Sequence, residues 1–224
     1  MRNRRRKGQE LVEFSITALM LAALLVGCFV TGMNLIRSIQ VNQVCGNMDD
    51  MYIHGADFST YAMQQLAQRL AQGLGLQIGT TFTGNNAGNT SNQGNALVTV
   101  SRVMYVGSTT SPNCVAVGAS NCTNANSFVF TQRIQFGNGT LSGQAPSTVG
   151  SPTTTVISSA GVITNPVTDA GAKLPAAYQT SFNHLWQTAL QDGQVCYVVE
   201  LYVQSPDLTL GSFAGGSVYA RSFY

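Results

Sequence analysis

Charged side chains are scarce in this chain, where they make up 9% of 224 residues, against about 25% in an average soluble protein. Five of the eleven basic residues lie in the first seven positions, as Arg2, Arg4, Arg5, Arg6 and Lys7. The rest of the chain contains six basic and nine acidic residues, so its net charge is −3. No basic surface remains there to neutralise phosphates, so nucleic acid is not an expected partner.

Groups that carry catalysis are also few. The sequence has two histidines, His54 and His184. His54 follows Asp50 by four residues, so the two could share a helical face, but two ligands without a third do not predict a metal site. There is no Gly-x-Ser-x-Gly elbow, and the glycine-rich "GLGLQIG" is not followed by the Lys-Ser/Thr pair of a phosphate-binding loop. We therefore expect no enzyme activity, no catalytic residue, no metal and no cofactor.

The five cysteines form no Cys-x-x-Cys pair and no cluster with histidine. Cys114 and Cys122 flank the loop "CVAVGASNC", and their spacing is compatible with a local disulfide in an oxidising compartment. Cys45 and Cys196 could form a second disulfide or remain free thiols, and the sequence leaves both outcomes open. Cys28 lies in an apolar run, where a cysteine acts as a small packing residue.

That apolar run, residues 11–36, is interrupted by one charged residue, Glu13, and by a few small polar residues. About 20 apolar residues span a bilayer core as a helix, so the run is long enough to cross a membrane. It is longer than the core of a cleavable secretory signal, and "NLIRSIQVNQ" behind it is not a secretory cleavage site. Because the basic cluster precedes the run, the positive-inside rule predicts a cytoplasmic N-terminus and a C-terminal domain outside the cytoplasm.

The most specific pattern is "RRRKGQELVEF", at the start of the run. A basic segment ends in Gly8, and Glu13 is the fifth residue when Gln9 is counted as the first. This arrangement resembles the class III signal of type IV pilins. The Glu-Phe pair and the layout of the chain resemble TadE-type pseudopilins of tight-adherence pili, and the late strand pattern "CYVVELYV" fits that layout. The resemblance implies that residues 1–8 are a leader, removed between Gly8 and Gln9 by a prepilin peptidase.

Glu13 would be costly in an apolar helix without a partner, because a carboxylate near the hydrocarbon costs a few kcal/mol on insertion scales. Cleavage after Gly8 would create an ammonium group at Gln9, which could pair with Glu13 in the same chain or in a neighbour. In a low dielectric such a pair would also fix the axial register of packed helices. Glu13 is therefore the expected assembly residue. Since type IV pilins commonly begin with phenylalanine, Gln9 leaves methylation of the new N-terminus open.

The resemblance implies a structural role, that of a pseudopilin or minor pilin in pilus assembly, surface adhesion and biofilm formation. The implied partners are a prepilin peptidase, other pilins or pseudopilins, an inner-membrane assembly platform and membrane lipid. The expected location is the inner (cytoplasmic) membrane, which the chain would cross once. Incorporation into a cell-surface pilus is left open. Two alternatives stay open: the major subunit of a type IV-like filament, and a signal-anchored exported binding protein or enzyme.

The assembly helix, residues 9–37, is expected to continue past the membrane into a helical extension, residues 38–78. The first part of the extension keeps apolar residues at a rough spacing of three to four, at Ile36, Ile39, Val44, Met48, Met51 and Tyr52. Gly55 then interrupts the pattern. A second helix follows in "DFSTYAMQQLAQRLAQGLGL", with an apolar stripe formed by Tyr61, Leu66, Leu70 and Leu74.

Residues 79–224 are expected to form an exported globular domain, which gives the whole chain an α+β fold with helices packed on an antiparallel sheet. Alternating β-branched and aromatic residues predict strands in "ALVTVSRVMYV", "SFVFTQRIQF", "QVCYVVELYVQS" and "SVYARSFY". The stretch "LPAAYQTSFNHLWQTALQD" predicts one more helix. Long polar loops join these elements, and in the tract 137–172 the patch "TTTVISSAGVIT" could be an edge strand.

Overall fold

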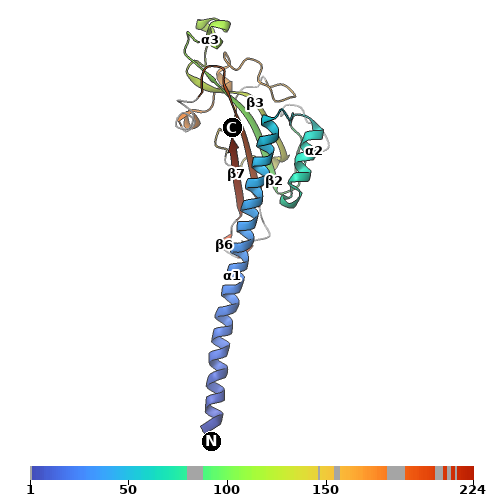
Figure 1. Cartoon of the computed structure of the whole chain (residues 1–224), viewed down its shortest axis with the longest axis vertical. Helices are drawn as coiled ribbons and strands as arrows, with labels where there is room; N and C mark the ends of the chain where they lie inside the picture. The colour runs from blue at the N-terminus through green and yellow to red at the C-terminus, as the bar shows by residue number, and fades with distance from the viewer. Residues whose placement is uncertain are drawn as a thin grey trace.

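The chain forms a long helical stem that carries a head at its C-terminal end (Figure 1). The stem is α1 (Arg2–Ile53), whose 52 residues extend about 78 Å at 1.5 Å per residue. The computed structural model describes residues 2–79, 88–145, 147–153, 157–180, 190–204, 209–210, 213–214 and 216–224. Side chains are described in the same ranges except for 2–11, 209–210 and 213–214.

The head is built on a five-stranded sheet with the strand order β1-β3-β2-β4-β7. The strands are β1 (Thr90–Ser91), β2 (Ala96–Val106), β3 (Ser127–Asn138), β4 (Val195–Gln204) and β7 (Ser217–Phe223). The four long strands pair antiparallel, and each coincides with a segment whose alternation predicted a strand. Two further strands, β5 (Thr209–Leu210) and β6 (Phe213–Ala214), pair with each other in a separate sheet.

The prediction of an entirely antiparallel sheet is wrong at one edge, because β1 pairs parallel with β3. The reason is topological. The chain reverses between β1 and β2, and β2 runs opposite to β3. A strand that runs opposite to β2 must run in the same direction as β3, so the sheet is mixed.

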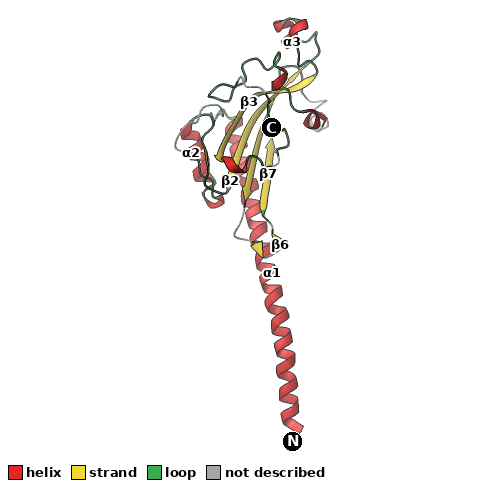
Figure 2. Ribbon diagram, turned by 180° about the vertical axis from the view of Figure 1, so that it is seen from behind, coloured by secondary structure: helices red, strands yellow, loops and turns green. Residues whose placement is uncertain are grey.

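The C-terminal part of α1 packs against one face of the sheet, over β4 and β7 (Figures 1 and 2). Its buried residues recur every three or four positions, at Val41, Cys45, Met48 and Tyr52. They join Val199, Leu201 and Val203 of β4 in one apolar cluster. Met48 and Tyr52 belong to the predicted stripe. Ile36 and Ile39, which the pattern also included, are exposed. They precede the part of α1 that packs on the sheet, which begins at Val41.

Gly55 ends α1 with a positive φ of 89°, a conformation that glycine adopts without strain. The second helix, α2 (Tyr61–Leu70), follows beside the stem (Figure 1). Its predicted apolar stripe is wrong in part, since Tyr61, Leu66 and Leu70 are exposed. The buried face carries Gln64 instead, whose amide donates to the carbonyl of Phe58 and accepts from the N–H of Asn89.

The face of the sheet opposite α1, which we call the outer face, is covered by the tract that follows β3. Val149, Ile163, Ala172 and Leu174 of this tract are buried in a second apolar cluster. The predicted edge strand is not seen in the described part of the tract, where residues 157–163 make only isolated bridges, such as Ile157 with Ile163. Of the helix predicted over 174–192, residues 176–180 are helical, and 181–189, with His184, lie outside the described residues.

Candidate functional site

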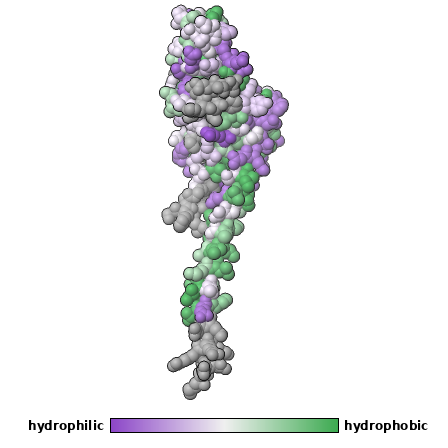
Figure 3. Space-filling model, turned by 60° about the vertical axis from the view of Figure 1, so that its left-hand side comes forward, coloured by the Kyte–Doolittle hydropathy of each residue, from purple (hydrophilic) through white to green (hydrophobic). Residues whose placement is uncertain are grey.

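The N-terminal part of α1 is an exposed apolar surface (Figure 3). Phe14, Leu19 and Met20 are each more than 70% exposed, and exposed apolar side chains continue to Ile39. The helix is long and apolar enough to cross a membrane. Its polar side chains suit that setting, because the hydroxyls of Thr17 and Thr31 donate to backbone carbonyls one turn earlier.

The expected cleavage site and Glu13 both lie on this helix. Gly8 and Gln9 are helical, and their side chains lie outside the described part of the chain. Glu13 is exposed, and its carboxylate has no partner among the side chains that are described. Gln9 and Glu13 are four residues apart, so they lie on the same helical face about one turn from each other. That spacing allows Glu13 to reach a new ammonium group at Gln9 within one chain.

At the other end of α1, a buried carboxylate that the sequence reasoning missed faces the sheet. Asp49 is 4% exposed, and its Oδ2 accepts a 2.6 Å hydrogen bond from the hydroxyl of Ser222 on β7. Its Oδ1 is buried without a partner among the described residues. Burial raises the pKa of Asp49, while the bond from Ser222 opposes that shift. A helical wheel would have shown the signal, because Asp49 follows Cys45 by four residues on the buried face.

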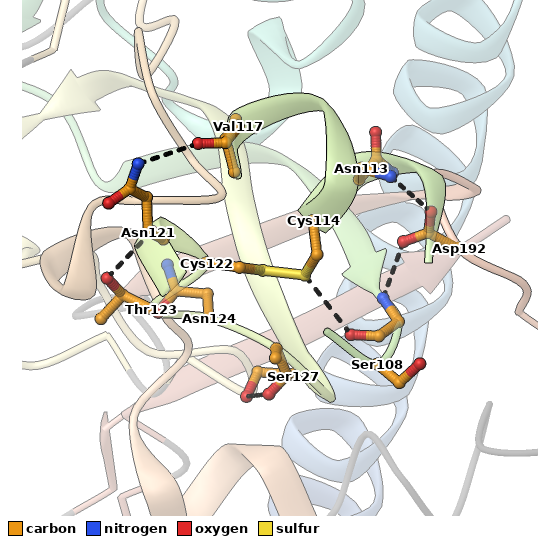
Figure 4. Close-up of a disulfide and its surroundings, with 12 residues drawn as sticks. Ser108, Asn113, Cys114, Val117, Asn121, Cys122, Thr123, Asn124, Ser127 and Asp192 are labelled. Atoms are coloured by element: carbon orange, nitrogen blue, oxygen red, sulfur yellow. Dashed lines mark hydrogen bonds between the residues drawn. A yellow bond between two sulfur atoms is a disulfide. The ribbon is translucent and has the colours of Figure 1, made fainter. Parts of the chain in front are cut away.

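Cys114 and Cys122 form a disulfide (Figure 4). It lies at the end of the head remote from the stem, where Figure 1 labels the short helix α3 (Pro112–Val117). The disulfide joins α3 to the turn that follows it. Asp192 fixes this loop to the sheet, since one carboxylate oxygen accepts from the N–H of Gly107 at 2.7 Å and the other from the N–H of Asn113 at 3.0 Å. Burial tends to raise the pKa of Asp192, but these hydrogen bonds outweigh it and lower the pKa.

Of the two outcomes that the sequence left open for Cys45 and Cys196, the structure has the second, with both as free thiols. The two cysteines belong to different apolar clusters. Cys45 faces the sheet from α1, and its Sγ lies 3.3 Å from the carbonyl oxygen of Val199. Cys196 is an odd number of residues from Val199 along β4, so the pleat directs it to the outer face. Burial raises the pKa of each thiol to about 12.

A second polar group that the sequence reasoning missed lies on the outer face. Glu200 is 4% exposed, and its carboxylate accepts hydrogen bonds from the hydroxyls of Ser147, Thr148 and Tyr219 and from the N–H of Thr148. Arg133 on β3 is 8% exposed on the same face. Burial lowers the pKa of the Arg133 guanidinium, and the nearby Glu200 opposes that shift. The signal in the sequence was a glutamate in the apolar strand "CYVVELYV".

The described residues contain no group of three or more His, Cys, Asp or Glu side chains that could hold a metal ion. His54 and Asp50 do meet, with 3.4 Å between Nδ1 and Oδ1, but both side chains are about three-quarters exposed. The structure thus brings together Cys114 with Cys122, keeps Cys45 and Cys196 apart, and places Gly8, Gln9 and Glu13 along one helix.

No protein-family model, curated protein or solved structure gives a significant match to the chain. Any statement of function therefore depends on the residues themselves and on where the fold places them.

Proposed function

We propose that this chain is a pilin-like structural subunit of the TadE type. In this proposal a prepilin peptidase removes residues 1–8, the exposed part of α1 is held in the inner membrane, and the head lies outside the cytoplasm. Subunits assemble through α1, with Glu13 paired to the new ammonium group at Gln9. The protein then serves pilus assembly and surface adhesion, and it is not an enzyme.

The observation that carries the proposal is the division of α1 into two parts. Before Val41 most of its described large apolar side chains are exposed, and from Val41 onward one face is buried against the sheet. A helix that only anchored the chain would not need to continue as part of the head's core. A stem that is rigidly joined to the head can transmit the position of the membrane helix to the surface domain. The start pattern around Gly8 and Glu13 supports the same reading.

Mass spectrometry of the mature N-terminus tests the proposal. The full chain would be expressed in cells with and without an active prepilin peptidase. We expect a chain that starts at Gln9 in the first cells and an intact leader in the second. A leader that stays attached in the presence of the peptidase contradicts the proposal.

The matched control is Gly8→Val, which keeps the basic cluster and the apolar run. We expect this variant to reach the membrane in the same amount as the wild type but to keep its leader. Cleavage of Gly8→Val at the same bond would show that another protease cuts there, and the proposal would then be wrong.

A further inference from the structure

The outer face of the sheet carries a small polar cavity of about 70 Å³. Its walls come from β2, β3, β4 and β7 and from the covering tract, and they include Thr99, Arg133, Gln135, Glu200 and Tyr219. The sheet register explains why a space exists. The short side chain of Thr99 on β2 lies between Gln135 on β3 and Glu200 on β4. The long side chains of Gln135 and Glu200 therefore leave a space above Thr99.

Side chains of opposite charge lie on the two strands that flank β2 at this cavity. Arg133 is on β3 and Glu200 is on β4, with β2 between them. Two interstrand spacings separate their backbones by about 9.5 Å across the sheet, and two residues separate their rows along the strands. No ion pair joins Arg133 to Glu200 at contact distance among the described residues, although both line the same cavity.

Arg133 has fewer hydrogen-bond partners than Glu200, and its guanidinium also lies over the ring of Phe130, 5.5 Å from the ring centroid. Its Nη1 and Nη2 each donate to a serine hydroxyl, Ser101 and Ser151, at 3.1 Å. These two bonds account for two of its five N–H groups among the described residues. A buried guanidinium normally pairs with an anion, because the loss of hydration is costly. Glu200 already accepts four hydrogen bonds, three of them at Oε1, which leaves its Oε2 with one partner.

We propose that this cavity binds a small zwitterion of the amino-acid type, with the carboxylate of the ligand at Arg133 and its ammonium group at Glu200. A simple anion would be attracted by Arg133 but repelled by Glu200. A simple cation would be attracted by Glu200 but repelled by Arg133. A dipolar ligand would bring an anionic group to Arg133 and a cationic group to Glu200 at the same time. The hydroxyls of Ser147, Ser151 and Tyr219 line the cavity and can form hydrogen bonds with the ligand.

The volume limits the ligand to a small one. At about 10–15 Å³ for each water-sized group, 70 Å³ takes about five non-hydrogen atoms, which is the size of glycine. Amino acids with large side chains should be excluded. Of the lining residues in the covering tract, Ser142 is exposed and Ala145 and Ser147 are half-buried, so the ligand would enter past this tract. The site is independent of the proposed role of α1, because α1 packs on the opposite face.

Calorimetric titration of the full chain in detergent micelles with glycine tests the proposal. We expect saturable binding of glycine. Glycolate and ethylamine, which keep one charge each, should bind at least about tenfold more weakly, because each pairs with only one of the two charged residues. Leucine should not bind. If glycine shows no saturable binding, or if glycolate or ethylamine binds as tightly, the zwitterion site is ruled out.

Two variants make the test specific. Ala145→Leu fills the cavity from the covering tract without removing a charge, and we expect at least about a tenfold loss of glycine affinity in a variant that still unfolds cooperatively. Arg102→Gln is the control, because Arg102 lies on β2 outside the cavity and donates from Nε to Thr131. It should bind glycine like the wild type. Equal affinity in Ala145→Leu and the wild type would place the glycine elsewhere and overturn the proposal.

Discussion

The hydroxyl of Ser222 on β7 donates a 2.6 Å hydrogen bond to Oδ2 of Asp49 on α1. The two residues are far apart in sequence, and their contact joins the stem to the last strand of the head. The other oxygen of Asp49 is buried without a partner among the described residues. The junction that holds the head on the stem therefore contains a carboxylate that is only half satisfied.

This arrangement predicts a pH-dependent stability that Asp49→Asn should remove. Burial raises the pKa of Asp49 above its ordinary value of 3.8. A protonated Asp49 stabilises the fold below the unfolded pKa, and this contribution is lost as the pH rises through the folded pKa. We expect Asp49→Asn to be more stable than the wild type at pH 7 by about 1 kcal/mol, with no difference at pH 3. Thermal unfolding at both pH values measures this.

Asp50→Asn is the control for that measurement, because Asp50 is about 75% exposed and one residue away. Its charge contributes less to the raised pKa of Asp49 than burial does, so Asp50→Asn should differ from the wild type much less than Asp49→Asn does. If Asp49→Asn were less stable than the wild type at pH 7, the hydrogen bond from Ser222 would depend on the charge, and the stated cost of the carboxylate would be wrong.

The thiols of Cys45 and Cys196 should be inert in the folded protein. Burial raises the pKa of each from 9.0 to about 12, and the thiolate is the reactive form. Alkylation with iodoacetamide at pH 8, followed by mass spectrometry of the peptides, should label neither residue in the native protein. Both should react in urea, which serves as the control. Rapid labelling of Cys45 in the native protein would contradict the packing of α1 on β4, and rapid labelling of Cys196 would contradict the covering of the outer face.

Asp192→Asn should loosen the disulfide loop without unfolding the sheet. The wild-type carboxylate accepts from the N–H groups of Gly107 and Asn113, and the amide of asparagine can replace only one of the two acceptors. Hydrogen exchange of these two amides should become about tenfold faster, while exchange within β2 and β4 stays unchanged. Unchanged exchange at Gly107 and Asn113 would show that Asp192 does not hold the loop.

The same carboxylate gives the loop a pH dependence of the opposite sign to that of Asp49. Because the pKa of Asp192 is lowered, its stabilising contribution is present above the ordinary pKa of 3.8 and is lost as the pH falls through the folded value. The difference in exchange between the wild type and Asp192→Asn should therefore persist at pH 5 and shrink at lower pH.

Glu13→Ala tests the assembly role of the N-terminal carboxylate. We expect normal insertion and normal cleavage after Gly8, because the basic cluster and the apolar run are unchanged. Assembly should fall by about tenfold or more, since the new ammonium group at Gln9 would lose its buried partner. The amount of subunit in a sheared surface fraction measures this, with Glu10→Ala as the control. Full assembly of Glu13→Ala would contradict the pairing.

The four long strands of the sheet could be predicted because their own residues specify them, whereas β1 lies in a polar segment whose residues indicate a loop. β2 and β4 match their predicted segments closely. Their β-branched and aromatic residues favour the extended conformation and alternate between the two faces of the sheet. The apolar face of α2 could not be predicted. Leu66 and Leu70 lie at helical spacing, but Gln64 makes two hydrogen bonds on the opposite side and so directs the leucines outward.

The sequence by itself determined the long apolar helix, the strands and the local spacing of Gly8, Gln9 and Glu13, because these properties depend on residues close together in the chain. Only the tertiary structure decided where α1 changes from an exposed helix to a buried one, since that boundary depends on how far the sheet reaches along the stem. It also decided that Asp49 faces β7 and that Arg133 and Glu200 share a cavity. Such contacts depend on strand order and register, which no local pattern specifies.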